Sequence, residues 1–232
     1  PDCLGDARVL HLSPAHHFPT GLVTPLHRRR ALIDWAQRVD GFIIEDDYDT
    51  EFRFQGRPLA PMLTMDPERV IYMNTFSKTL SPSIRISYMV LPQALMARFR
   101  EKLGFYGCTV PSFEQYTLAY FLDRGYFEKH INRMRKFYRA RRNRVIAMLE
   151  RCPAADKLTI LEQDAGLHFL LKVETALDDR ALTALFAQSG LHVQTLSSFH
   201  THPTEDCRGM LVINYSAVDE RALEEGLGKL EI

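Results

Sequence analysis

The amino-acid sequence predicts an α/β fold, with a mainly parallel sheet in residues 1–105, followed by long connecting helices and a small C-terminal α+β domain in residues 106–232. In the first part, short and continuously apolar strands alternate with turns and a helix, which is typical of a doubly wound parallel sheet. In the second part, helix and strand patterns follow each other. The 232 residues are 46% apolar and 25% charged, which excludes a disordered or fibrous chain.

The first predicted elements are a strand and a helix. Residues 7–12 form the strand, because they are mainly apolar and a turn-rich segment follows them. Thr24 and Pro25 are typical of a helix start, with threonine as the N-cap and proline as the first helical residue, and Gly41 ends the helix. Apolar residues at helical spacing support it: Leu32, Trp35, Ala36 and Val39. Further strands are predicted at residues 41–46, 69–75 and 84–91.

The middle of the chain is predicted to be helical. Residues 93–103 form one helix, and Ser112 opens the next with a capping box that includes Gln115. Gly125 ends that helix, and residues 126–151 form a long one. The domain boundary is placed in this stretch, near Tyr106. In the last domain, strands are predicted at residues 167–173, 191–196 and 210–215, and helices after Asp178 and Asp219.

Charge and cysteine content restrict the function. Basic and acidic residues number 29 each, so the net charge of +0 argues against DNA binding through a general basic field. No apolar run reaches the ~18 residues that cross a bilayer, and the first residues lack the features of a secretion signal. His200 and His202 lack a third ligand at zinc-like spacing, so no metal site is expected. Four scattered cysteines are expected to be reduced thiols of a cytoplasmic protein: Cys3, Cys108, Cys152 and Cys207.

Lys78 is the first candidate for chemistry. It lies in the segment TFSKTL at residues 75–80, which directly follows a predicted buried strand. Ligands of open α/β sheets bind beyond the carboxyl ends of the strands, and a sheltered lysine there can act as an amine nucleophile. An isolated lysine in such a place is more often a solvated loop residue, so its neighbours decide between the two interpretations.

The neighbours of Lys78 favour a phosphate-bearing cofactor. Ser77 offers a hydroxyl to a phosphate, and Arg85 offers a guanidinium. The acidic run EDDYD at residues 45–49 ends another predicted strand and therefore lies at the same sheet edge. One of its carboxylates can pair with a positive ring nitrogen, and Tyr48 can donate to a phenolate oxygen; an exposed acidic loop is the alternative. Together these are the groups that pyridoxal 5'-phosphate (PLP) needs.

The chain resembles the aminotransferase-like domain of MocR-type regulators in the GntR superfamily. The resemblance rests on residues 43–92, with the EDDYD and SKTL blocks, and on SPAHHFPTG at 13–21, the helical residues 121–145 and AGLHFLL at 165–171. It implies part of the fold-type I PLP-dependent three-layer sandwich with a mainly parallel sheet, plus a C-terminal α+β small domain. It also implies that the N-terminal part of the family's domain is missing from this chain.

The resemblance implies a role for each candidate residue. Lys78 forms the Schiff base with PLP and is the catalytic residue. Asp46 contacts the pyridine nitrogen, and Tyr48 contacts the phenolic oxygen of the ring. Ser77 and Arg85 contact the phosphate.

Other positions depart from the family pattern or carry no assigned chemistry. His17 replaces the usual glutamine, and Ser83 replaces the commoner glycine before Arg85. His168 is expected to be a core or domain-junction histidine. Arg208 precedes a late strand and is the candidate for binding a substrate carboxylate, with an exposed loop arginine as the equal alternative.

The resemblance also implies partners and a limitation. Fold-type I domains carry a Gly/Ser-rich phosphate turn and a ring-stacking aromatic that would precede residue 1, so this chain alone is expected to bind PLP weakly or not at all. A homodimer is expected for the full-length protein. DNA would be bound only through a winged-helix domain that is not present here.

Two functions use the same cofactor chemistry. The first is the effector domain of a transcription regulator that senses an amine or amino acid through the Lys78 Schiff base. The alternative is a free-standing PLP-dependent aminotransferase, in which Lys78 is also the general base. A third interpretation is an incomplete PLP fold without activity. A winged helix upstream would favour the regulator, and amino transfer to a 2-oxo acid would favour the enzyme.

Two surface features remain. The basic run at residues 133–144 is expected to be a solvated helix face rather than a DNA contact. Five aromatic residues are expected in the core and the dimer interface rather than on a nucleic-acid surface: Phe105, Tyr106, Phe113, Tyr116 and Phe121.

Overall fold

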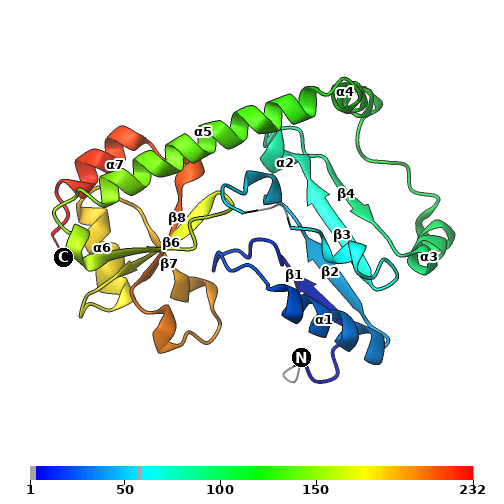
Figure 1. The fold of residues 1–232 in the computed structure, drawn as a ribbon, viewed down its shortest axis with the longest axis horizontal. Helices are drawn as coiled ribbons and strands as arrows, with labels where there is room; N and C mark the ends of the chain where they lie inside the picture. The colour runs from blue at the N-terminus through cyan, green and yellow to red at the C-terminus, as the bar shows by residue number, and fades with distance from the viewer. Residues whose placement is uncertain (1–3, 57–58, 232) are drawn as a thin grey trace. The chain divides into compact units, whose positions relative to one another are not determined.

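The computed structural model describes residues 4–56 and 59–231, and its ribbon is shown in Figure 1. The chain divides into two compact units, each described by itself. The first comprises Pro1–His17, Leu22–Glu51 and Arg57–Arg133, and the second comprises Phe18–Gly21, Phe52–Gly56 and Met134–Ile232. The division after Arg133 falls inside a long helix, whereas the sequence places the domain boundary near Tyr106. Cys3 lies outside the described residues.

The first unit contains a four-stranded sheet in the order β1-β2-β3-β4. Its strands are β1 (Val9–Leu12), β2 (Phe42–Asp46), β3 (Val70–Thr75) and β4 (Ser87–Val90). The first three are parallel, and β4 runs antiparallel to β3, which confirms the mainly parallel sheet. Asp46 on β2 pairs with Met73 on β3, so the carboxyl ends of these two strands lie side by side.

Helix α1 (Leu26–Arg38) packs on one face of this sheet, where Ile33 joins Ile43 and Val70 in a buried apolar cluster. The apolar spacing of the predicted helix is therefore confirmed. The predicted threonine cap is wrong, because Pro25 occupies the N-cap position and no side chain caps the helix. The Thr24 carbonyl instead accepts a hydrogen bond from the buried Arg29 side chain at 2.8 Å.

The first unit continues with α2 (Phe76–Thr79), α3 (Gln93–Leu103) and α4 (Ser112–Asp123). Helix α5 (Tyr126–Leu149) begins in the first unit and ends in the second. The predicted capping box is wrong: Pro111 is the N-cap, so Ser112 is already helical, and the Gln115 amide donates to the Val110 carbonyl at 2.7 Å.

The aromatic residues around α4 are not core residues. Phe105, Tyr106, Phe113 and Tyr116 are between 68% and 80% exposed. The expectation that they are buried within the chain is therefore wrong, and their place in a dimer interface stays a prediction.

The second unit is an antiparallel sheet with helices packed on it, which confirms the predicted α+β part. The strand order is β5-β6-β8-β7. The strands are β5 (Leu158–Leu161), β6 (His168–Val173), β7 (Gln194–Thr195) and β8 (Met210–Asn214), and the helices are α6 (Asp179–Gln188) and α7 (Glu220–Leu227). Val145 of α5, Phe186 of α6 and Leu227 of α7 share one buried cluster with Phe169 and Leu171 of β6.

The predicted strand at residues 191–196 is shorter than expected. Only Gln194–Thr195 pairs with β8, because the chain turns into a 3₁₀ helix at Leu196–Phe199. Strand β5 was missed by the sequence patterns. The two predicted helix starts hold, since the carboxylates of Asp178 and Asp219 accept backbone N–H bonds at the starts of α6 and α7.

The basic run of α5 is a solvated face only in part. Arg133, Lys136, Arg139 and Arg144 are exposed, but Arg142 is buried, and four arginines of the run bind groups of the second unit. Arg139 donates to the Phe54 carbonyl at 2.8 Å, and Arg141 donates to the Ser216 carbonyl at 3.0 Å. Arg142 is buried, donates to the Gln163 carbonyl and lies over the Phe54 ring. Arg144 forms a two-bond ion pair with Glu220 at 2.6 and 2.7 Å. These contacts use the guanidinium donors that DNA phosphates would need.

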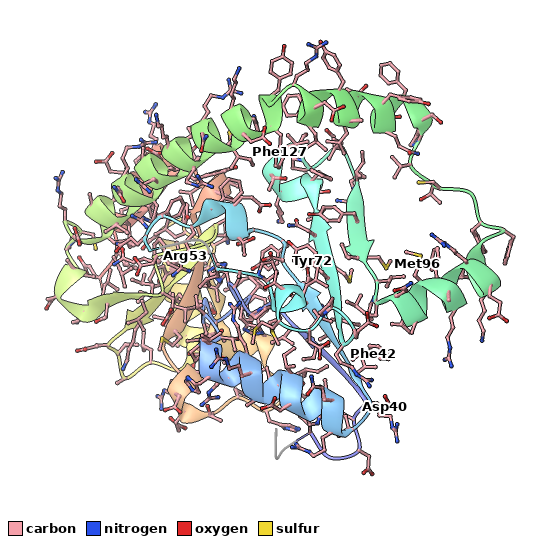
Figure 2. The ribbon with its side chains drawn as sticks, turned by 45° about the vertical axis from the view of Figure 1, so that its right-hand side comes forward. Asp40, Phe42, Arg53, Tyr72, Met96 and Phe127 are labelled. Atoms are coloured by element: carbon pink, nitrogen blue, oxygen red, sulfur yellow. The ribbon has the colours of Figure 1, made fainter. Side chains whose placement is uncertain are left out.

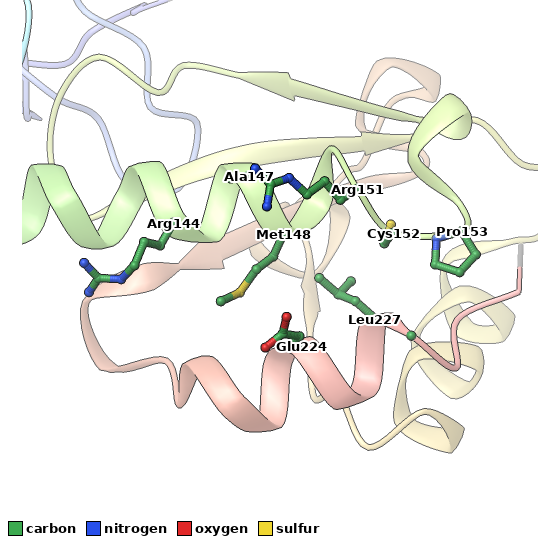
Figure 3. Close-up of a pocket in the computed structure, with 9 residues that line it drawn as sticks. Arg144, Ala147, Met148, Arg151, Cys152, Pro153, Glu224 and Leu227 are labelled. Carbon is green, nitrogen blue, oxygen red and sulfur yellow. The ribbon is translucent and has the colours of Figure 1, made fainter.

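A cavity of about 450 Å³ opens in the second unit between the end of α5 and α7. Figure 3 shows Met148 of α5 and Glu224 and Leu227 of α7 in its lining. None of the predicted site residues lines it. Among the described residues, no helix is long and apolar enough to span a membrane.

Candidate active site

Lys78 lies on a tight turn that the end of β3 holds in place. The Thr75 hydroxyl caps the short helix α2 by accepting the Ser77 N–H at 3.1 Å. The Phe76 N–H donates to the Ile86 carbonyl at 2.9 Å, which ties the start of α2 to the segment before β4. Lys78 itself is exposed. The turn therefore fixes the backbone around a lysine whose amine is open to solvent.

Two residues of α5 contact the short helix α2 that carries Lys78. His130 lies within hydrogen-bond distance of the Thr79 carbonyl, with Nε2 3.0 Å from the oxygen. The ring of Phe127 packs edge-on against Phe76, with ring centroids 5.8 Å apart, and Figure 2 labels Phe127 near α2. Sequence reasoning missed His130, because nothing in the local pattern shows that α5 reaches back to α2.

The acidic run, which begins at the end of β2 and continues beyond it, alternates between buried and partly exposed residues. Glu45, Asp47 and Asp49 are buried, and the alternation of a β-strand places Asp46 on the opposite face, where its side chain is 35% exposed. Tyr48 follows on the same side in the alternation and is half-buried. The run is therefore neither an exposed acidic loop nor a single functional cluster.

Glu45 holds a neighbouring segment. Its Oε1 accepts the Met62 N–H at 2.8 Å, and its Oε2 accepts the Leu63 N–H at 3.0 Å, at the start of the 3₁₀ helix Met62–Thr64. Burial raises the pKa of Glu45, and the two backbone bonds oppose that rise. The carboxylate thus caps a helix end inside the core.

Asp47 belongs to a buried polar chain. The Tyr72 hydroxyl donates to Asp47 Oδ2 at 2.8 Å, and the Asn74 amide donates to the Tyr72 hydroxyl at 3.0 Å and to Glu51 Oε1 at 3.4 Å. Figure 2 labels Tyr72 on β3. Burial raises the pKa of Asp47, of Glu51 and of Tyr72.

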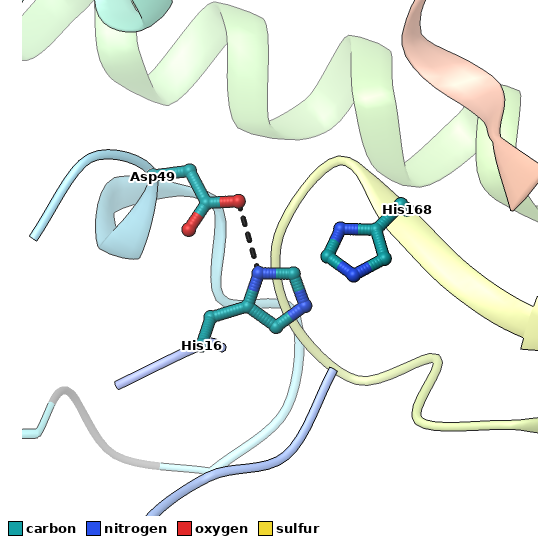
Figure 4. A group of neighbouring side chains, drawn as sticks. All are labelled: His16, Asp49 and His168. Atoms are coloured by element: carbon teal, nitrogen blue, oxygen red, sulfur yellow. Dashed lines mark hydrogen bonds and ion pairs between the residues drawn. The ribbon is translucent and has the colours of Figure 1, made fainter. Parts of the chain in front are cut away.

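Asp49 pairs with a histidine of the first unit. His16 Nδ1 lies 3.0 Å from Asp49 Oδ2, the contact drawn in Figure 4, and both side chains are at most 2% exposed. With this pair, Glu45, Asp47 and Asp49 all have structural partners. Asp46 is therefore the carboxylate in residues 45–49 that is partly exposed to solvent.

Asp46 lies next to His11 of β1. His11 Nε2 lies 3.4 Å from Asp46 Oδ2, and the imidazole is 59% exposed. The pairing of β1 with β2 brings the two residues together. Sequence reasoning missed His11, although its period-2 position on a strand next to β2 was a signal for it.

Tyr48 carries an unused hydrogen-bonding group. Its hydroxyl is buried and has no hydrogen-bond partner among the described residues. Burial first, and then the negative charges of Asp49 and Asp46, raise the pKa of Tyr48, so the hydroxyl stays protonated and able to donate. A buried donor without a partner costs free energy unless a ligand atom accepts its bond.

Ser77 lies in α2 beside Lys78, and Arg85 lies in the segment that connects α2 to β4. Ser77 is half-buried and Arg85 is exposed. Arg85 has a positive φ of 50°, a left-handed conformation that costs a non-glycine residue roughly 1–2 kcal/mol. Such strain is typical of functional sites. Arg208 belongs to the second unit, where its guanidinium donates to the Ala176 carbonyl at 3.1 Å and is half exposed.

The residues of the first unit fit PLP. The cofactor needs an amine, a carboxylate for its ring nitrogen, a donor for its phenolic oxygen and groups for its phosphate. Lys78 offers the open amine and Asp46 the outward carboxylate, and Tyr48 offers a buried donor that has no partner within residues 4–56 and 59–231. Asp46 ends β2, Tyr48 follows it, and Lys78 follows β3; the carboxyl ends of these two strands are adjacent.

Comparison with known proteins identifies the class. The chain matches the family described as aminotransferase class I and II over residues 6–230, and it belongs to that family. It is also similar to a solved structure, the kynurenine aminotransferase of Pyrococcus horikoshii in complex with PMP, with a TM-score of 0.79 and 28% identity over 97% of this chain and 55% of that one. The predicted part of an α/β aminotransferase fold is thereby confirmed.

Within this family, the chain is similar to transcription regulators. It is 37% identical to the uncharacterized HTH-type transcriptional regulator YdeL of Bacillus subtilis, over 96% of this chain and 48% of the relative. It is 36% identical to the probable rhizopine catabolism regulatory protein MocR of Rhizobium meliloti, over 96% of this chain and 45% of the relative. The resemblance to MocR-type regulators is thus confirmed, and the chain spans about half the length of these relatives.

Proposed function

We propose that this chain is the PLP-binding, aminotransferase-like effector domain of a MocR-type transcription regulator, and that it senses an amine or amino acid through Lys78. One observation carries the proposal: the outward carboxylate Asp46 and the partnerless hydroxyl of Tyr48 follow the strand adjacent to the one that leads to Lys78. The similarity to MocR over 96% of the chain supports the regulatory part. DNA would be bound by another domain of the gene product.

Each residue has a defined task in this proposal. When bound, PLP supplies an aldehyde that condenses with amines and a ring that withdraws electrons. Lys78 would provide the primary amine that holds the cofactor's aldehyde, and an effector amine would compete with it for that position. Asp46 keeps a proton on the ring nitrogen, and Tyr48 donates to the phenolic oxygen. Ser77 and Arg85 bind the phosphate.

Two further roles stay predictions. Arg208 is the candidate ligand for the carboxylate of an amino-acid effector, because an exposed guanidinium can bind a carboxylate through two parallel bonds. A homodimer is the expected state of the gene product, and the exposed aromatic residues Phe113 and Tyr116 are candidates for its interface.

An aminotransferase is the second candidate function. The kynurenine aminotransferase of Pyrococcus horikoshii is 28% identical to this chain and covers nearly all of it, and that protein is an enzyme. In an enzyme, the same Lys78 amine, once displaced, would act as the general base that moves a proton on the substrate. The residue set is the same for both functions, so an experiment has to separate them.

The test uses the gene product that contains this chain, loaded with PLP. A panel of amines and amino acids is added while the visible absorbance and the affinity for its promoter DNA are followed. A regulator changes both, and Lys78→Ala abolishes both, whereas Lys102→Ala on α3 retains them. Repeated amino transfer to a 2-oxo acid, with DNA affinity unaffected by amines, would establish the aminotransferase instead. An unchanged response in Lys78→Ala would remove Lys78 from either function.

A further inference from the structure

A small apolar cavity lies in the first unit between α4 and the turn that follows Lys78. Its volume is about 300 Å³, near the lower end of the range for small-molecule pockets. It is lined by Leu80, Ile84, Phe113, Glu114, Thr117, Leu118 and Phe121. Leu80 is two residues beyond Lys78, but Lys78 itself does not line the cavity. Nothing in the proposed PLP site uses this space.

Glu114 gives the cavity its chemical character. Its Oε2 is buried and has no hydrogen-bond partner among the described residues. The other polar side chain of the lining, Thr117, donates its hydroxyl to the Phe113 carbonyl at 2.8 Å. The position of Glu114 in the first turn of α4 suits a negative charge near a helix N-terminus, but that does not satisfy a buried carboxylate oxygen.

These observations define the chemistry of an occupant. A carboxylate among Leu80, Leu118 and Phe121 repels anions, and a neutral apolar molecule would leave the oxygen without a partner. A primary ammonium group donates the missing bond with opposite charge, and a short alkyl chain covers the apolar lining. We propose that the cavity binds a free primary alkylammonium ion, with its nitrogen on Glu114 Oε2.

This site is separate from the proposed cofactor site. It needs neither PLP nor Lys78, so it can be tested on the cofactor-free chain. Failure of this inference leaves the proposed function untouched, and failure of PLP binding leaves this site untouched. If both hold, the chain has two places that recognise amines, one by covalent chemistry and one by charge.

The first experiment compares probes of equal carbon number on the unmodified chain. Calorimetric titration with n-pentylammonium, 1-pentanol and pentanoate is expected to rank them in that order. The ammonium should bind about tenfold more tightly than the alcohol, since bonds to charged groups are the stronger ones. Equal affinity for the ammonium and the alcohol would overturn the proposal, because the cavity would then be only an apolar groove.

The second experiment uses matched variants. Glu114→Gln is expected to lower the affinity for n-pentylammonium about tenfold and to leave that for 1-pentanol unchanged. Asp123→Asn, which removes an exposed acid from the last turn of α4, should change neither. Equal losses in the two variants would show only general charge attraction and contradict the proposal. So would ammonium binding that disappears as the protein concentration rises, because a basic side chain of a second copy would then be the occupant.

Discussion

Glu45→Gln is expected to destabilise the first unit by about 1.5–2 kcal/mol, whereas Asp46→Asn is expected to change its stability by less than about 1 kcal/mol. The two acids are adjacent in sequence, but Glu45 accepts two buried N–H bonds and Asp46 has one exposed histidine 3.4 Å away. Each bond to a charged acceptor contributes about 1.5–3 kcal/mol. The glutamine side chain keeps one oxygen that can accept one of the two backbone N–H bonds, but its NH₂ group faces the other N–H donor, so that bond is lost.

The estimate for Glu45→Gln uses the lower half of that range, because burial raises the pKa of Glu45 and so already disfavours its charge. Urea unfolding followed by far-UV circular dichroism measures both variants against the parent. PLP binding, followed by visible absorbance, should show the reverse order, with Asp46→Asn the weaker binder. Equal destabilisation by the two substitutions would refute the placement of Glu45 and Asp46 on opposite faces of β2.

Three further outcomes are expected. Tyr48→Phe should leave the urea midpoint equal or higher, because it removes a buried hydroxyl without a partner, while it weakens PLP binding. Burial raises the pKa of Asp47 above its ordinary 3.8, so the protonated side chain stabilises the fold fully below pH 3.8. This contribution is lost as the pH rises through the raised pKa of the folded protein. Paired urea titrations should therefore show that the parent loses stability relative to Asp47→Asn as the pH rises from 3.8 through that raised pKa. Arg142→Ala should cost about 2–3 kcal/mol, because its guanidinium is buried on Phe54. Arg144→Ala should cost much less, because its ion pair is half exposed; chemical denaturation of the second unit checks both.

The order of the elements and the position of Lys78 could be predicted from the sequence. Strand patterns at residues 41–46 and 69–75 correspond to β2 and β3, and SKTL follows β3 as expected. Local patterning is enough for these features, because a buried strand followed by a polar turn has few alternative interpretations. The division of the acidic run was also within reach, since strand alternation separates Glu45 and Asp47 from Asp46.

Contacts between residues that are far apart in the chain could not be predicted from the sequence. The Thr79 carbonyl meets His130 because α5 returns to α2, and Arg139 and Arg142 bind carbonyls that are 85 and 21 residues away. A run of arginines looks the same whether solvent or carbonyl oxygens satisfy its donors. The helix caps failed by one residue at Thr24 and at Ser112, because a proline took the N-cap position in each case.

The reactivity of Lys78 toward PLP is the central claim, and reductive trapping tests it most directly. The gene product that contains this chain is mixed with excess PLP and reduced with borohydride, and the modified lysines are located by mass spectrometry. Lys78 and Lys102 are both exposed, so accessibility alone would label them equally. Modification is expected to be concentrated at Lys78 and to be lost from that peptide in Lys78→Ala. Equal modification of Lys78 and Lys102 would contradict it.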